Sequence, residues 1–82
     1  MALENNERIL SYTEAVKLLS PREVQIMDYI IEGYTISEIA NKLYLSEHTI
    51  NTHKKNITRK LSIYGPNAII KWREAVRNNF GQ

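Results

Sequence analysis

Apolar and polar residues recur along the chain with a helical period, and the first clear helix is predicted from residue 21. Ser20 and Pro21 are typical of an N-cap followed by proline at the first helical position, and Glu23 completes a capping box. Gly33 is expected to end this helix. Its apolar residues are Ile26, Met27, Ile30 and Ile31.

A second, short helix is predicted after Thr35, which is a suitable N-cap because Glu38 follows three residues later. Residues 44–46 then form a tight turn. The apolar residues of this short helix are Ile36, Ile39, Ala40 and Leu43. The sequence therefore predicts a capped short helix that leads through a turn into a third helix.

The third helix is predicted to begin after its N-cap, Ser46, and to run to about Leu61. Ile50, Ile57 and Leu61 lie within about 40° of one another on a helical wheel, so they form one apolar stripe. The opposite side carries hydrogen-bonding groups without a carboxylate: His48, Asn51, Thr52, Lys55 and Arg59. One flank carries Thr49, Asn56 and Lys60. The two helices and their turn indicate a helix-turn-helix, whose second helix enters the major groove of DNA.

Gly65 and Pro66 interrupt the chain before a last amphipathic helix. Its apolar face comprises Ala68, Ile69, Trp72, Ala75 and Val76. Between Ile9 and Leu19 the helical spacing is only approximate, so a short leading helix and a linker both remain open, and residues 1–8 are expected to be disordered. Since β-type alternation is absent from the sequence, the expected fold is all-α: a four-helix bundle that contains a helix-turn-helix, with a short extra N-terminal helix as the open alternative.

The composition narrows the possible functions. A chain of 82 residues suits one domain with a modest core, and self-association through the last helix would help to bury its apolar face. Cysteine is absent and the two histidines lack clustered partners, so neither a metal site nor a cofactor is expected. Ser46, His48 and His53 have no orienting carboxylate, so no catalytic site is expected. No signal peptide or membrane span is recognisable, which predicts a soluble, cytoplasmic protein.

The charge is unevenly distributed along the chain. Residues 1–33 carry six acidic and three basic side chains, whereas residues 34–82 carry eight basic and three acidic ones. A basic second half favours a polyanionic partner, and here it coincides with the predicted helix-turn-helix. Double-stranded DNA is therefore the expected partner.

A run of short motifs keeps a fixed spacing between residues 19 and 61. They are Leu19-Ser20-Pro21-Arg22-Glu23, Glu32-Gly33, Glu38-Ile39-Ala40, Leu43, Leu45-Ser46-Glu47, Thr49-Ile50, Thr52-His53, Asn56-Ile57 and Arg59-Lys60-Leu61. In these motifs the chain resembles the LuxR-type (GerE/FixJ/NarL) DNA-binding domain of bacterial transcriptional regulators. The resemblance covers more than half of the chain and extends more loosely to about Val76.

The resemblance implies a four-helix domain that binds DNA as a dimer, with no small-molecule ligand of its own. By family position, the predicted base-contacting residues are His48, Asn51, Thr52 and Lys55. The predicted phosphate-contacting residues are Ser37, Ser46, Thr49, His53, Asn56, Arg59 and Lys60. The dimer contact is expected on the last helix, at Ala68, Ile69, Trp72, Ala75 and Val76. RNA polymerase remains open as a further partner.

Four departures from the family pattern bear on these expectations. Asn51 stands where lysine is frequent, and Lys54 replaces a commonly apolar residue, so that its stem is expected to pack while its ammonium reaches outward. Ser62 stands where glycine usually ends the recognition helix. The loop 63–66 lacks the polar and basic residues commonly found there. These changes concern sequence preference and dimer detail rather than the fold.

Two alternatives to a LuxR-type domain remain. A sigma-factor-like promoter-binding region has a similar opening and helix-turn-helix and works with RNA polymerase. A protein-interaction or dimerisation module would leave the basic face merely solvated. The predicted organisation is an N-terminal extension or linker over residues 1–18, the LuxR-type domain over 19–78 and a C-terminal tail over 79–82. In the resembling families this domain usually follows a phosphoreceiver or ligand-sensing domain.

Overall fold

A computed structural model describes residues 10–80 of the chain, and the side chains of residues 10–78. Within this range the chain forms five helices and no strand, which confirms the predicted all-α fold. The helices are α1 (Tyr12–Leu18), α2 (Pro21–Ile31), α3 (Ile36–Leu43), α4 (Glu47–Leu61) and α5 (Ala68–Phe80). The disorder expected for residues 1–8 concerns a segment outside the described residues.

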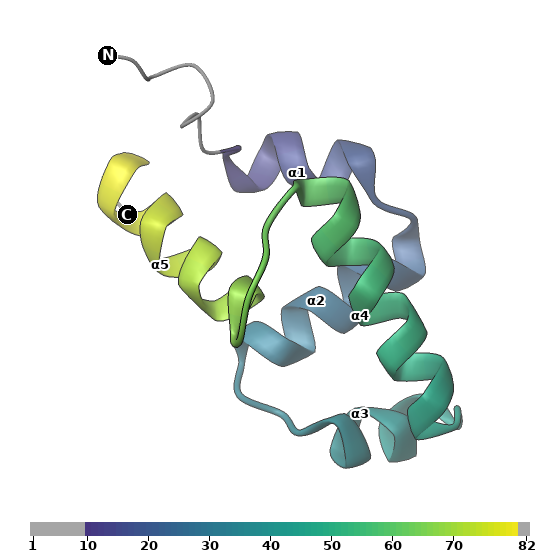
Figure 1. Cartoon of the computed structure of the whole chain (residues 1–82). Helices are drawn as coiled ribbons and strands as arrows, with labels where there is room; N and C mark the ends of the chain where they lie inside the picture. Colours follow the sequence, from purple (N-terminus) through teal and green to yellow (C-terminus); the bar gives the residue numbers. More distant parts are fainter. Residues whose placement is uncertain (1–9, 81–82) are drawn as a thin grey trace.

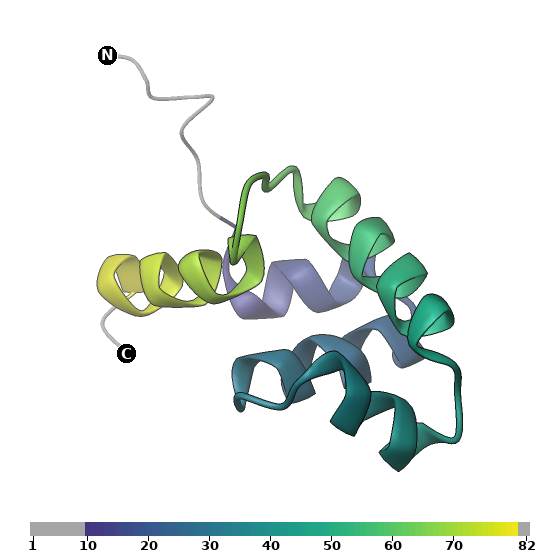
Figure 2. The same ribbon diagram turned by 60° about the horizontal axis from the view of Figure 1, so that its bottom comes forward.

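The arrangement centres on α2, which packs against α4 on one side and α5 on the other (Figure 1). The short helix α3 packs against α2 and α4 and lies at the end of the molecule where α4 begins (Figure 2). Helices α3 and α4 with the turn between them form the helix-turn-helix that the sequence predicts.

Serine and threonine caps explain where the first four helices begin. Ser11, Ser20 and Thr35 each accept a hydrogen bond from the backbone N–H three residues later, and a glutamate at that position accepts one from the cap backbone. Ser46 caps α4 by accepting from the Thr49 N–H at 3.0 Å. Each cap contributes about 1 kcal/mol to its helix.

The core is a single cluster of mostly aliphatic side chains supplied by all five helices and by Leu19. Its members are Ala15, Leu19, Ile26, Met27, Ile39, Ala40, Ile50, Ile57, Leu61, Ile69, Trp72 and Val76. Burial of one large apolar side chain stabilises the folded state by about 1.5–3 kcal/mol. The predicted stripe of α4, Ile50 with Ile57 and Leu61, is confirmed as the face turned to the core.

The helix α1 belongs to the packed body of the molecule. Ala15 is fully buried, the Trp72 indole N–H donates to the Leu10 carbonyl at 3.1 Å, and the Tyr12 hydroxyl donates to Asp28 at 2.8 Å. The sequence left a short leading helix and a linker open for residues 9–19, and the structure shows a helix over Tyr12–Leu18. Residues 12–18 are therefore not a linker, and the folded unit begins before the boundary predicted at residue 19.

The helix α5 differs from its prediction in two respects. It continues to Phe80, so the predicted tail over 79–82 begins within the helix. Four of the five residues expected at a dimer contact are 2–8% exposed within a single chain: Ala68, Ile69, Trp72 and Val76. Ala75, the fifth, is only partly exposed at the edge of this face. The apolar face of α5 is thus part of the core, where it packs against α2 and where Trp72 donates to the carbonyl of Leu10.

Two helices end in the left-handed conformation without a glycine. Tyr44 ends α3 with φ 58°, and Ser62 ends α4 with φ 56°. This conformation costs a residue with a β-carbon about 1 kcal/mol or more. The expectation that Ser62 occupies a position suited to glycine is therefore supported by its backbone geometry.

We predict that Ser62→Gly raises the free energy of unfolding by up to about 1 kcal/mol, because glycine adopts this conformation without steric strain while gaining some freedom in the unfolded chain. Urea titration monitored by helical circular dichroism would measure the change. Ser62→Ala, which keeps a β-carbon, is the matched control and should stay within about 0.5 kcal/mol of the wild type. A loss of stability in the glycine variant would contradict the prediction.

The tyrosine that joins α1 to α2 should make stability sensitive to alkaline pH. Burial, together with the hydrogen bond and the negative charge of Asp28, raises the pKa of Tyr12 from 10.0 to about 12. Since the folded pKa is the higher one, the stabilisation is complete below pH 10 and is lost as pH rises towards 12.

We therefore expect the stability difference between wild type and Tyr12→Phe to shrink between pH 9 and pH 12, because the wild type then loses the hydrogen bond that the variant lacks throughout. Unfolding at a series of pH values for both proteins measures it, and their shared lysines and other tyrosines cancel in the comparison. A difference that stays constant across this range would refute the role given to this hydroxyl.

Candidate nucleic-acid interface

The packing of α4 decides which of its side chains face solvent. Ile50, Ile57 and Leu61 are 0–5% exposed and hold one side of the helix against α2 and α3. Because side chains on the opposite side of a helix then point outward, the predicted polar face is presented to solvent. Its five members are all exposed: His48, Asn51, Thr52, Lys55 and Arg59.

A groove runs between this face and the loop that joins α4 to α5. It has a volume of about 460 Å³ and is lined by His48, Asn51, Lys54, Lys55, Thr58 and Gly65. Three of the four predicted base-contacting residues line it, whereas Thr52 does not. The loop connects the end of α4 to the start of α5 (Figure 1), and its Gly65 lines the groove together with the α4 residues.

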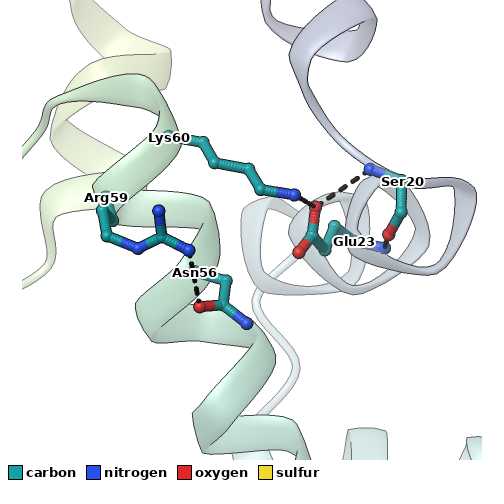
Figure 3. A network of polar contacts seen from close by, with 5 residues as sticks. All are labelled: Ser20, Glu23, Asn56, Arg59 and Lys60. Atoms are coloured by element: carbon teal, nitrogen blue, oxygen red, sulfur yellow. Dashed lines mark hydrogen bonds and ion pairs between the residues drawn. The ribbon is translucent and has the colours of Figure 1, made fainter.

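Hydrogen bonds within α4 restrict what its polar groups offer a ligand. The Thr52 hydroxyl donates to the His48 carbonyl at 3.1 Å, so towards a ligand the hydroxyl oxygen acts as an acceptor. The Arg59 guanidinium donates to the Asn56 side-chain oxygen at 3.0 Å (Figure 3). These two residues, both predicted at phosphates, therefore hold one another in position on the helix surface.

Further residues predicted to contact phosphates lie on α3 and α4, several of them near the start of a helix. Ser46 donates its hydroxyl to the Thr49 hydroxyl oxygen at 3.0 Å while capping α4, so this pair stands at the N-terminus of the helix. Ser37 is exposed in the first turn of α3. His53 is partly buried, and its Nδ1 atom is buried without a hydrogen-bond partner. These residues lie on α3 and on the side of α4 away from Gly65.

Lys60, which the sequence predicts at a phosphate, forms an ion pair within the chain. Its ammonium lies 2.8 Å from the carboxylate of Glu23 at the start of α2, and Glu23 is only 4% exposed (Figure 3). The same carboxylate oxygen accepts from the Ser20 backbone N–H at 2.9 Å. The pair thus ties α4 to the N-terminal cap of α2, and the Lys60 charge is opposed by a buried acid.

The pKa of Glu23 reflects this environment. Burial by itself would raise the pKa, but the hydrogen bonds from Lys60 and Ser20 and the positive charge of Lys60 outweigh it, so the pKa lies below 4.5. A lowered folded pKa means that the carboxylate stabilises the fold above pH 4.5 and that this contribution is lost as pH falls below the folded pKa.

Three residues of the groove lie outside the contacts predicted from the sequence: Lys54, Thr58 and Gly65. Thr58 lies one turn from Lys54 and Lys55 on the helix, so the helical wheel could have included it. Gly65 could not have been found in this way, because its position beside α4 depends on the path of the loop. Among the described residues, no group of histidines and acids is arranged to hold a metal ion, and no helix is long and apolar enough to cross a membrane.

The fold and this face define a helix-turn-helix DNA-binding domain of a transcriptional regulator, which is a non-enzymatic class. A family model described as "Bacterial regulatory proteins, luxR family" matches residues 17–72. The chain belongs to the luxR family of bacterial regulatory proteins. This assignment confirms the resemblance seen in the sequence and decides against the sigma-factor alternative.

Individual relatives are similar over most of this chain. The oxygen regulatory protein NreC of Staphylococcus aureus is 34% identical over 68 residues, which cover 83% of this chain and 31% of NreC. The RcsB response regulator of Salmonella typhimurium superposes with a TM-score of 0.67 at 34% identity, over 74% of this chain and 30% of RcsB. RcsB in its complex with DNA gives a TM-score of 0.66 with the same identity and coverage. The chain spans less than a third of the length of these relatives.

The ion pair between α2 and α4 gives a prediction about stability. Lys60→Met leaves the Glu23 carboxylate buried without its cation, and we expect the free energy of unfolding at pH 7 to fall by about 1–3 kcal/mol. The loss is smaller than for a fully buried pair, because Lys60 is 33% exposed and water can approach it. Urea unfolding would measure it.

The loss of unfolding free energy in Lys60→Met should be smaller at about pH 3 than at pH 7, because the unpaired Glu23 of the variant is then protonated. Lys60→Arg, which restores a cation, is the matched control and should recover most of the stability. If Lys60→Met left stability unchanged and weakened duplex binding instead, Lys60 would be a phosphate contact as the family position predicts.

Proposed function

We propose that this chain binds double-stranded DNA sequence-specifically for transcriptional control, with α4 in the major groove. The observation that carries the proposal is the exposed, carboxylate-free polar face of α4, held outward by a buried stripe in a family of DNA-binding regulators. An α-helix is about as wide as the major groove of B-DNA, so such a face can meet base edges. The complex of RcsB with DNA supports the class of partner.

The proposed base-contacting residues each offer a chemically distinct group. Asn51 can pair with both the N6 amino group and N7 of adenine, and Lys55 can donate to guanine O6 and N7. Thr52 presents a methyl group suited to the thymine methyl, because its hydroxyl donates to the helix backbone. His48, at the start of α4, can donate or accept according to its tautomer.

The phosphate contacts are proposed on the side of α4 and α3 away from the loop. Ser46 and Thr49 at the start of α4, Ser37 in the first turn of α3, and Asn56 with Arg59 provide neutral donors and one positive charge. Such contacts fix the register of the helix on the duplex and make the affinity depend on salt. A contact between this domain and RNA polymerase remains a prediction from the sequence.

Dimerisation is a separate part of the proposal. Two copies on adjacent half-sites about 10 bp apart would place two α4 helices in successive major grooves. Since the apolar side of α5 is buried, pairing through this helix would use its outer side, where Lys71, Glu74 and Arg77 are exposed. A two-fold symmetric recognition sequence would support this arrangement, and a single asymmetric half-site would count against it.

Selection of bound sequences from a random duplex pool tests the proposal directly. We expect the wild type to enrich a shared motif and the triple variant His48→Ala, Asn51→Ala, Lys55→Ala to lose or degrade it. Circular dichroism would show that the variant stays folded, since all three residues are exposed. No enrichment by the folded wild type would overturn sequence-specific binding and favour the interaction module.

The contribution of Lys55 can be tested on the selected motif. Lys55→Ala should cost about 1–3 kcal/mol of binding free energy and relax the preference at one or two base pairs. Fluorescence anisotropy on a set of single-base variants of the motif would measure it, with Lys17→Ala on α1 as the control for removal of one charge. An equal loss on every sequence would instead assign Lys55 to the phosphate backbone.

A further inference from the structure

We propose that the groove between α4 and the loop 62–67 binds a backbone phosphate of the DNA duplex, with Lys54 as its cation. The inference rests on the proposed function and extends it to the other side of the recognition helix. Lys54 lies outside the set of DNA contacts taken over from the family pattern, where this position is commonly apolar. The groove is lined by α4 residues and by Gly65.

The geometry of a helix in the major groove leads to this assignment. The major groove of B-DNA is about 12 Å wide, and a helix with its side chains is about 10–12 Å across. Both sides of a helix that lies in the major groove therefore approach a phosphate strand. Thr49, Asn56 and their neighbours occupy one side of α4. Lys54 and Thr58 occupy the other side, about 140–180° away on the helical wheel and facing the loop. The residues on the first side of α4 are therefore proposed to contact the phosphates of one DNA strand, and Lys54 is proposed to contact those of the other strand.

The charge of the groove suits a phosphate. Lys54 and Lys55 contribute two positive charges, and no acidic residue lines the groove. The only acid in α4 is Glu47, in its first turn and outside the groove. On the other side of the helix the Lys60 charge is opposed by Glu23. Lys54 is thus an exposed cation without an acid in its own groove, so its charge is available to attract a phosphate.

The loop leaves room for the sugar-phosphate chain. Gly65 has φ +94°, and nothing lies within 4 Å of the position that a β-carbon would take there. The backbone of the loop is therefore uncovered on this side. Because the residues 63–66 carry no basic side chain, the cation for a phosphate at this place has to come from α4. Lys54 lines both this groove and the adjoining hollow of about 140 Å³ beside Pro66 and Asn67.

The test is the salt dependence of duplex binding by Lys54→Met, which removes the charge and keeps the aliphatic stem. One phosphate contact contributes about 0.9 to the slope of log K against log[salt] and corresponds to about an eightfold change in affinity at 0.1 M salt. We expect Lys54→Met to lower the slope by about this amount and to weaken binding about eightfold, both on the preferred motif and on random duplex. Lys54→Arg should retain the wild-type affinity and slope.

Lys17→Met is the matched control, because it removes one exposed positive charge from α1. Equal losses in Lys17→Met and Lys54→Met would overturn the inference in favour of a general effect of net charge. Wild-type affinity and slope in Lys54→Met would overturn it and leave the proposed function standing, as would a loss confined to the preferred motif. A wild type that binds no duplex at any salt concentration would overturn the proposed function and the inference together.

Discussion

The burial of one narrow side of α4 is the constraint on which the rest of the structure depends. Only Ile50, Ile57 and Leu61 of this 15-residue helix are buried, and they pack in one core cluster with apolar side chains of α2 and α3. A helix held on so narrow a stripe leaves most of its circumference to solvent. The same contacts that stabilise the domain therefore determine which side chains of α4 face solvent, and these are the side chains proposed to contact DNA.

The polar network at the start of α2 complements this stripe. Glu23 completes the capping box of α2 and also accepts from Lys60 near the end of α4, so one carboxylate connects the start of α2 with the end of α4. A buried ion pair contributes less to stability than its geometry suggests, since both charges lose hydration. Its hydrogen bonds nevertheless join the side chain of Lys60 on α4 to the N-terminal cap of α2 through one carboxylate oxygen.

The helices at the two ends of the described chain complete the core instead of extending from it. The Trp72 indole on α5 donates to the Leu10 carbonyl just before α1, and Ala15 of α1 is fully buried. The apolar side of α5 that suggests a dimer contact from sequence is covered in this way by the chain itself. An amphipathic pattern shows that a face is buried, but the pattern is the same whether the covering surface comes from the same chain or from a second copy.

The sequence by itself determined the four helices from residue 21, their caps, the helix-turn-helix and the outward face of α4. These features follow from short-range signals: capping boxes, glycine and proline positions, and a 3.6-residue period. Only the tertiary structure decided that α1 is a packed helix, that Lys60 pairs with Glu23 across 37 residues, and that Gly65 stands beside Lys54. The reason is physical, because such contacts join segments far apart in the chain and depend on how helices and loops pack, which a local pattern does not encode.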